Sequence, residues 1–276
     1  MKRFTAIILA AVLVLSSAAI NVSANTTENV FVTIADENGK LALARVAVTV
    51  SDIDADGAIT INDALYAAHE TFYEGGAAAG YASSMTEYGL SLTKLWGVEN
   101  GGSYGYYVND ASAWSLTDPV AEGDHVYAFV YTDTVAWSDA YSWFDASAKD
   151  ASAGDAITLS LSSLGYDADW NQVVSPVEGA KITVNGEDAG VVTDASGKAV
   201  ITLDKAGTYT VSAKSDNMTL VPPVFVISVA AADTAVTPAL PQTCTAPVAV
   251  YMAVGMLMLA MGCVMITETR KRNNEI

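Results

Sequence analysis

An uncharged apolar run over residues 246–266 constrains this chain more than any other feature of its sequence. A helix needs about 20 such residues to cross the hydrocarbon core of a bilayer, so the run predicts a transmembrane helix. Arg270, Lys271 and Arg272 follow it within a short tail, residues 267–276. Because basic residues beside a span stay on the cytoplasmic side, we expect the chain before the span to face outward.

The amino-terminal segment predicts export. Lys2 and Arg3 precede an apolar stretch at residues 6–15 that is short for a membrane span, and small residues follow at 22–24. This order is typical of a secretory signal peptide, so we expect residues 1–24 to be removed from the mature protein. An uncleaved amino-terminal anchor is the alternative.

A short motif precedes the apolar run, at the end of a predicted stalk over residues 231–245. Its residues are Leu240, Pro241, Gln242, Thr243 and Cys244. Together with the span and the basic tail, the motif resembles the sorting signal of Gram-positive cell-wall proteins, Leu-Pro-X-Thr-Gly. The resemblance implies that a sortase attacks the Thr243 carbonyl and transfers the chain to the cell wall. Cys244 stands where that family has glycine, so a simple one-span membrane anchor is the alternative.

Composition narrows the class of protein and its partners. The chain has 31 Asp and Glu but 13 Lys and Arg, for a formal net charge of −18. Such a surface repels nucleic acid and anionic lipid and favours cations or basic surfaces, unless the acidic coat serves solubility alone. Both cysteines, Cys244 and Cys263, fall at the predicted anchor, so the exported part contains none. A cysteine-free exported part of this size favours a bacterial surface protein.

Residues 135–155 are small and acidic without a sustained period, and they predict a connector between two domains at 25–134 and 156–230, or else the edge of each domain. Short alternating runs predict strands in the second domain, at residues 157–161, 180–184, 190–192, 199–203, 207–213 and 223–229. Several short strands at this spacing favour a β-sandwich. The runs resemble the immunoglobulin-like or prealbumin-like repeats of bacterial surface proteins, which implies a spacer or an adhesive module.

A spaced series of aspartates in the first domain predicts a calcium loop. Oxygen donors stand at positions 1, 3, 5, 7 and 12 of the loop, the seventh being a main-chain carbonyl: Asp52, Asp54, Asp56, Ala58 and Asp63. Gly57, at position 6, permits the sharp turn that such a loop needs. The loop resembles that of an EF-hand and, in its aspartate at position 12, that of a dockerin. A single loop with this shorter ligand predicts a structural calcium site of modest affinity, ~0.1 to 1 mM. The alternative is an acidic turn that caps a predicted helix at residues 62–72.

The order of elements around this loop carries a further resemblance. A predicted hairpin, residues 31–34 and 44–50, precedes the loop, and extended segments follow the helix at 92–97, 105–110 and 120–131. This order resembles the transcobalamin-like carboxy-terminal family, a β-grasp-like module whose Tyr-X-Val-Asn-Gly core appears here with aspartate in place of glycine. The resemblance implies a mixed sheet with one main helix. The predicted fold class is therefore this α+β module followed by an all-β immunoglobulin-like sandwich.

The sequence predicts no enzyme. The two histidines, His69 and His125, accompany neither a nucleophile motif nor a second metal ligand at a suitable spacing. Aromatic residues between 104 and 131 either form core or line a ligand face. We therefore expect a surface-anchored, calcium-binding protein that displays its domains for binding or adhesion to a protein, glycan or small molecule. The alternative is capture of a corrinoid or another small molecule that is passed to a transporter.

Overall fold

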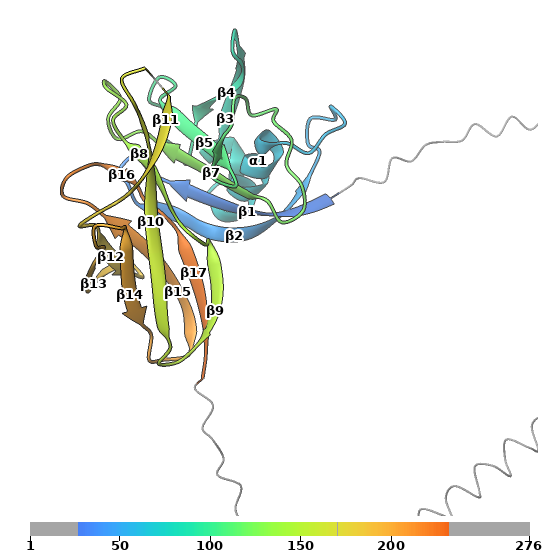
Figure 1. Cartoon of the computed structure of the whole chain (residues 1–276). Helices are drawn as coiled ribbons and strands as arrows, with labels where there is room; N and C mark the ends of the chain where they lie inside the picture. Colours follow the sequence, from blue (N-terminus) through green and yellow to red (C-terminus); the bar gives the residue numbers. More distant parts are fainter. Residues whose placement is uncertain (1–26, 170, 232–276) are drawn as a thin grey trace, which may run out of the picture. The chain divides into compact units, whose positions relative to one another are not determined.

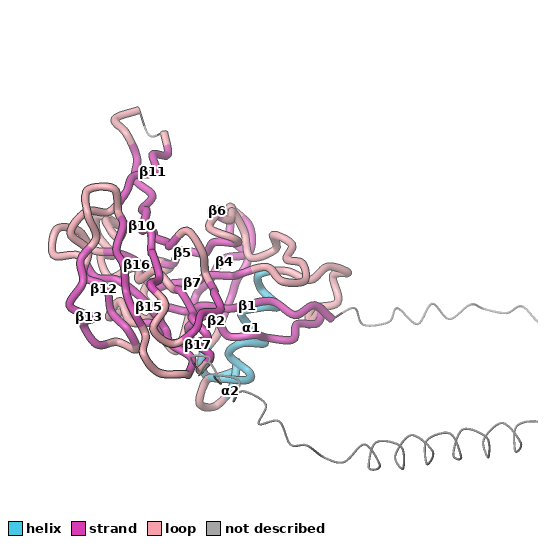
Figure 2. Tube along the Cα trace, turned by 60° about the horizontal axis from the view of Figure 1, so that its bottom comes forward, coloured by secondary structure: helices cyan, strands magenta, loops and turns pink. Residues whose placement is uncertain are grey.

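The computed structural model describes residues 27–169 and 171–231 (Figure 1). The expected signal peptide, residues 1–24, lies outside these ranges, as do the expected sorting motif, span and basic tail, residues 240–276. Among the described residues, no helix is both long enough and apolar enough to cross a bilayer. Strands predominate in this part of the chain, as Figure 2 shows.

A mixed five-stranded sheet forms the amino-terminal half. Its strands, in spatial order, are β2 (Leu41–Ser51), β1 (Thr27–Ala35), β7 (His125–Val130), β5 (Tyr104–Val108) and β6 (Ala111–Ser112). β1 pairs antiparallel with β2 and parallel with β7, so the first strand lies inside the sheet. A bulge interrupts the pairing of β1 with β2, and there the Arg45 amide donates to Thr33 Oγ1 at 3.0 Å.

Two helices and a hairpin connect β2 to β5. α1 (Ile61–Phe72) and the short α2 (Gly76–Gly80) come first, and the hairpin of β3 (Ala82–Thr86) and β4 (Gly89–Lys94) follows. Apolar side chains recur in α1 at intervals of three and four residues, which places them on one helix face: Ile61, Ala64, Leu65 and Ala68. That face joins one hydrophobic core with β1, β2 and β7.

The central strand β7 of the mixed sheet is buried on both faces. On one face, Val126, Ala128 and Val130 of β7 belong to the core that contains α1. On the other face, side chains from this sheet pack with residues of the carboxy-terminal half in a second core: Ala35, Tyr107, Tyr127, Phe129, Tyr141, Val221 and Val224. Every residue of β7 is consequently buried, which explains why its sequence does not alternate between apolar and polar.

Two further sheets form the carboxy-terminal half. One contains β8 (Ala140–Phe144), β10 (Ala156–Tyr166), β11 (Gln172–Pro176), β14 (Lys198–Thr202) and β16 (Leu220–Val221). The other contains β13 (Glu187–Val192), β12 (Lys181–Val184), β15 (Gly207–Lys214), β17 (Phe225–Ala230) and β9 (Ala148–Ser152). Both sheets contribute to one hydrophobic core, to which β10 gives Ile157, Leu159 and Leu161 at every second position.

The segment expected as a connector, residues 135–155, differs from that expectation because it contains two strands. β8 pairs antiparallel with β10, and β9 pairs parallel with β17. Most side chains of β9 are exposed, and its residues are Ala, Ser, Lys and Asp, which are weak strand formers. Its strand structure depends on pairing with a distant segment, which no local pattern in the sequence reveals.

Candidate metal centre

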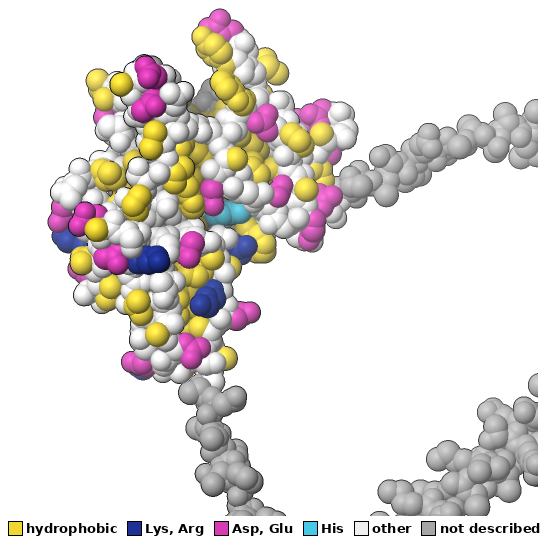
Figure 3. Space-filling view, in the orientation of Figure 1, with side chains coloured by type: hydrophobic (Ala, Val, Ile, Leu, Met, Phe, Trp, Pro, Cys, Tyr) yellow, Lys and Arg dark blue, Asp and Glu magenta, His cyan; other side chains and the backbone are white. Residues whose placement is uncertain are grey.

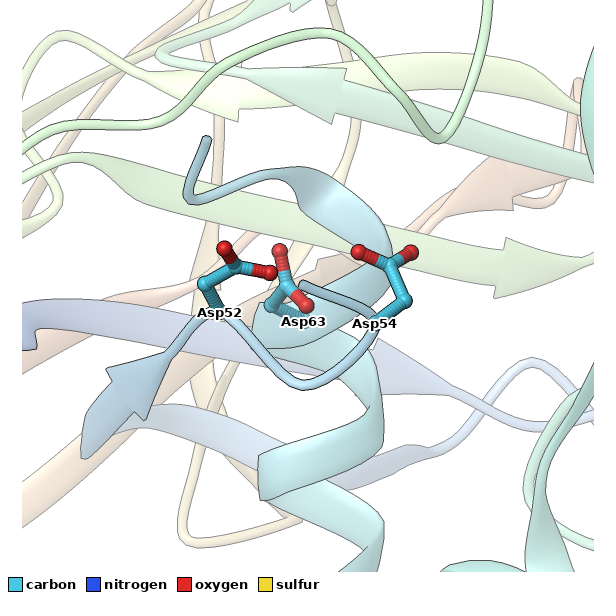
Figure 4. A group of neighbouring side chains, drawn as sticks. All are labelled: Asp52, Asp54 and Asp63. Atoms are coloured by element: carbon cyan, nitrogen blue, oxygen red, sulfur yellow. The ribbon is translucent and has the colours of Figure 1, made fainter. Parts of the chain in front are cut away.

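Three aspartates of the predicted calcium loop lie together between β2 and α1 (Figure 4). Asp52 and Asp54 belong to the loop, and Asp63 belongs to the first turn of α1. One carboxylate oxygen from each of the three lies within 4.8 Å of the other two. Figure 4 shows the Asp63 carboxylate between those of Asp52 and Asp54. The fold therefore brings the first, third and twelfth loop positions together.

The loop closes around Asp52. Its Oδ1 accepts a hydrogen bond from the Asp56 amide at 3.2 Å, and its Oδ2 accepts one from the Gly57 amide at 2.9 Å. Ala55 and Gly57 take left-handed backbone angles, with φ of 59° and 93°. Left-handed angles at two such closely spaced residues turn the chain sharply, and glycine adopts them at the least steric cost. This turn returns the chain toward α1.

Asp63 has a second role as a helix cap. Thr60 is the N-cap of α1, and its amide donates to Asp63 Oδ2 at 2.8 Å, while the Thr60 side chain accepts from the Asp63 amide. These reciprocal bonds form a capping box. Asp63 Oδ1 accepts from the Ile53 amide at 3.0 Å, and the side chain is fully buried. The acidic cap and the cluster of carboxylates, which the sequence left as alternatives, thus occur together at this residue.

Asp56 and Ala58 are placed differently from the other three predicted ligands. Both are exposed, as Asp54 is, but Asp56 Oδ1 accepts a hydrogen bond from the Ala58 amide at 2.9 Å within the loop. In the described part of the chain, the close group of metal-ligating side chains contains Asp52, Asp54 and Asp63 without Asp56. Ligation by Asp56 and by the Ala58 carbonyl stays a prediction from their spacing.

The cluster carries negative charge without a cationic side chain to balance it. Partial burial, and after it the charges of Asp56 and Asp63, raise the pKa of Asp54 above its ordinary value. The ion pairs formed among residues 27–169 and 171–231 are Lys94 with Glu99 and Lys181 with Asp216, and neither involves the loop. A divalent cation with a preference for oxygen ligands fits this donor set, because it would neutralise the mutual repulsion.

Asn62, which the sequence did not single out as a site residue, connects the loop to β3. Its side chain is 6% exposed, and its Nδ2 donates to Asp54 Oδ2 at 3.4 Å. Its Oδ1 accepts from the Tyr81 hydroxyl at 2.7 Å and from the Ser83 hydroxyl at 3.1 Å. No local signal could have identified this role, since Tyr81 and Ser83 lie on a separate segment that the fold brings beside α1.

Both histidines are buried and hydrogen-bonded. His69 Nδ1 lies 2.7 Å from the Leu65 carbonyl oxygen, and its Nε2 accepts from the Trp96 amide at 3.0 Å. His125 Nε2 lies 2.7 Å from Thr33 Oγ1. Burial lowers the pKa of each imidazole to about 4. Both rings are therefore neutral at pH 7 and belong to the packed interior.

The aromatic residues on strands are largely core. Tyr104, Tyr107, Tyr127 and Phe129 are all buried. Tyr107 stacks on Tyr141 with ring centroids 3.6 Å apart and an angle of 3° between the ring planes. Trp114 differs, because it follows β6 and is 90% exposed. Four aromatic side chains from the predicted strands thus contribute to packing and do not line a ligand face.

Comparison with known proteins adds little to this geometry. No protein-family model matches the chain, and no curated protein matches it. Among solved structures, the four amino-terminal immunoglobulin domains of Dscam1 isoform 9.44 align at a TM-score of 0.22 and 10% identity, over 39% of this chain and 23% of theirs. The ectodomain of a teleost fish polymeric immunoglobulin receptor aligns at 0.20 and 14% identity, over 48% of this chain and 64% of its own. TM-scores this low support no inference about fold or function.

Proposed function

We propose that this chain is a calcium-binding protein displayed outside the cell for binding or adhesion. The observation that carries the calcium site is the convergence of Asp52, Asp54 and Asp63, which form no ion pair with Lys or Arg in the part of the chain that the structure describes. Carboxylate oxygens at this separation suit calcium, which takes six to eight oxygen ligands at about 2.3–2.6 Å. Asp56, the Ala58 carbonyl and water complete the proposed shell. The chemistry that calcium supplies here is structural, since it holds oxygens together and polarises no substrate.

The proposed calcium ion acts as a clip between strand and helix. Asp52 and Asp54 follow β2 directly, whereas Asp63 lies in α1, and a shared cation would join the two elements. Hydrogen bonds already orient the Asp52 and Asp63 carboxylates, so little ordering remains for the ion to impose. The exposed loop leaves the site open to solvent on the side of Asp54. These features suit a site of modest affinity that is occupied at millimolar calcium.

The proposed location depends on the two ends of the sequence. The signal peptide predicts export, and the apolar run with its basic tail predicts a single-pass anchor with the domains outside the cell. Transfer of Thr243 to the cell wall by a sortase is the further proposal that the sorting motif suggests. The mixed sheet with its main helix and the two sheets behind it are in keeping with a β-grasp-like, transcobalamin-like module followed by an immunoglobulin-like sandwich. Such a protein would present its first module at a distance from the membrane.

Calcium titration of the purified chain, kept in mild detergent and first stripped with EDTA, tests the site. Isothermal titration calorimetry is expected to show saturable binding with a Kd of about 0.1–1 mM. A tenfold excess of calcium over Kd adds about 1.4 kcal/mol to the free energy of unfolding, which thermal denaturation detects as a higher Tm.

Two isosteric variants define where the calcium binds. Asp54→Asn removes one charge from the cluster and is expected to weaken calcium binding about tenfold, a loss of about 1.4 kcal/mol. Asp167→Asn is the matched control, because Asp167 accepts amide hydrogen bonds from Asp169 and Asn171 in another acidic turn. The calcium affinity of the Asp167→Asn variant should equal that of the unmodified chain. Absence of binding at millimolar calcium, or equal affinity in Asp54→Asn, would refute the site.

A further inference from the structure

A cavity of about 600 Å³ lies beside the β3–β4 hairpin, separate from the aspartate cluster. Its lining combines three hydroxyl side chains, a carboxylate, an aromatic ring and an aliphatic side chain: Thr86, Ser91, Thr93, Glu87, Tyr88 and Leu92. Gly101 and Gly102 form the opposite part of the lining. The volume falls within the range of about 300–1,000 Å³ typical of ligand pockets. A lining that combines polar and apolar groups suits a ligand that presents both kinds of surface.

One aromatic side chain lines this cavity and another contacts a residue next to the lining, and both are accessible. Tyr88 lines the cavity and is 81% exposed. Trp137 is 62% exposed, and its indole nitrogen lies 3.3 Å from the hydroxyl of Ser103, the residue after Gly102. The hairpin stands away from its neighbours in Figure 1, and Figure 3 shows apolar side chains along it with acidic ones at the tip. Exposed rings beside a polar cavity typify binding surfaces better than they typify core.

The cavity is held in shape by the backbone around it. Within the hairpin turn, Thr86 Oγ1 donates to the Gly89 carbonyl at 2.8 Å and accepts from the Tyr88 amide at 3.2 Å. A hydrogen bond from another segment also holds the hairpin, because the Leu116 amide donates to the Leu90 carbonyl at 2.9 Å. A site that is formed before its ligand arrives loses less conformational entropy on binding.

The charges around the cavity select among ligand classes. Glu87 is the charged residue of the lining, and the neighbouring Lys94 pairs with Glu99 at 2.8 Å. An anionic ligand would therefore meet a carboxylate without a free cation to balance it. An apolar ligand would cover the exposed Thr93 hydroxyl and the Glu87 carboxylate without offering either a hydrogen bond. A neutral ligand with many hydroxyl groups satisfies both conditions.

We propose that this cavity and its aromatic rim bind a neutral oligosaccharide. A sugar ring presents C–H groups on its faces, which suit the negative faces of Tyr88 and Trp137, and hydroxyl groups at its edge. Those hydroxyls bond to the side chains of Thr86, Ser91 and Thr93, and Glu87 accepts a further hydrogen bond. The proposal specifies the ligand class of the binding role proposed above, and it does not require calcium.

An array of immobilised neutral and anionic glycans tests the proposal with the full chain. The detergent must lack sugar head groups, because a maltoside would compete for the cavity. We expect retention on neutral oligosaccharides and none on sulfated or uronic-acid glycans. Retained sugars are then titrated while tryptophan fluorescence is followed, since Trp137 is expected to change its emission on binding.

Three variants locate the site on the hairpin. Tyr88→Ala removes the ring and is expected to weaken binding about tenfold, whereas Tyr88→Phe keeps the ring and should stay within about threefold. Phe72→Ala removes a ring that is 43% exposed on α1, away from the cavity lining, and should leave the affinity unchanged. Equal retention of anionic glycans, no retention of any neutral glycan, or equal loss in Tyr88→Ala and Phe72→Ala would overturn the proposal.

Repeating the titration in EDTA separates this proposal from the calcium site. Glycan binding that persists in EDTA, whether or not calorimetry detects calcium, supports the cavity as an independent site. Glycan binding that disappears in EDTA would overturn the proposal of an independent site and show that the cavity depends on calcium.

Discussion

Asp54, in the amino-terminal half, and Asp194, in the carboxy-terminal half, both follow a strand and occupy a turn, yet their surroundings act on them in opposite directions. The Ser196 hydroxyl and the amides of Lys198 and Ser196 donate to Asp194 and lower its pKa. Partial burial and neighbouring carboxylates raise the pKa of Asp54. A turn that satisfies its own carboxylate is complete as a structural element. The turn around Asp54 gathers charge that it does not neutralise, and it is the turn at which we propose an ion.

Substitution at the contact between the two halves is expected to lower the free energy of unfolding most. Tyr141 is 3% exposed, stacks on Tyr107 and donates to Asp110 at 2.9 Å. Tyr141→Ala is expected to cost about 3–5 kcal/mol of unfolding free energy and to divide one urea transition into two. Tyr88 is exposed, so Tyr88→Ala should change the free energy of unfolding by less than about 0.5 kcal/mol. A single unshifted transition in Tyr141→Ala would show that the halves are not coupled through this ring.

The two buried histidines are expected to make the free energy of unfolding depend on pH. The imidazoles of His69 and His125 have a pKa of about 4 in the folded chain, against about 6.5 in the unfolded chain. The unfolded state therefore binds protons first, and stability falls as the pH drops from about 6.5 toward 4, by on the order of 2–3 kcal/mol per histidine. Urea unfolding in EDTA at pH 7 and pH 4.5 measures the loss. His69→Gln and His125→Gln should each flatten this dependence, and profiles parallel to the unmodified chain would contradict the assignment.

Replacing Asp54 and Asp194 by asparagine, one at a time, tests whether the two turns differ in their need for calcium. Without calcium, Asp54→Asn is expected to stabilise the fold slightly because it relieves repulsion, and with calcium it should lose most of the added stability. Asp194→Asn is expected to destabilise the fold equally with and without calcium, because it weakens hydrogen bonds that do not involve an ion. Thermal denaturation of both variants in EDTA and in millimolar calcium measures these differences. If calcium raised the Tm of both variants equally, the two turns would not differ in their dependence on calcium.

Substitution of the two loop residues with left-handed backbone angles is expected to change stability least. Gly57→Ala places a Cβ where φ is 93° and should cost about 1 kcal/mol, together with some calcium affinity. Ala55→Gly relieves a similar strain at φ of 59°, although the freer unfolded chain offsets part of the gain. We expect the two substitutions to shift the Tm in opposite directions. Equal shifts would mean that the loop relaxes around either residue.

Much of the carboxy-terminal half could be predicted from the sequence, because each of its core strands has one buried and one exposed face. The alternation of Ile157, Leu159 and Leu161 is an example, and the strands expected from such runs are present. The sequence did not predict strands β8 and β9, because neither alternates regularly between buried and exposed residues. β9 presents mostly exposed small or polar residues, and β8 is buried largely through contacts with distant segments.

The sequence predicted which aspartates form the candidate metal centre, but it did not predict all of the hydrogen bonds that position them. Loop spacing alone identified Asp52, Asp54 and Asp63, which the fold brings together. The capping bond between Thr60 and Asp63 follows a local pattern, and the sequence supported a cap only as an alternative to the metal loop. The link from Asn62 to Tyr81 depends on where β3 begins relative to α1, which is a property of the folded chain.

The last strand determines how the fold would respond to mechanical force. β17 pairs antiparallel with β15 from Val211 to Gly207 and parallel with β9 from Ala148 to Ser152. Inter-strand hydrogen bonds lie across the strand direction, so a pull along β17 from its carboxyl end loads both ladders in shear. Bonds loaded in shear must fail together, whereas bonds peeled from one end fail in turn. Tension transmitted along the chain beyond residue 231 would thus meet a mechanically resistant strand first.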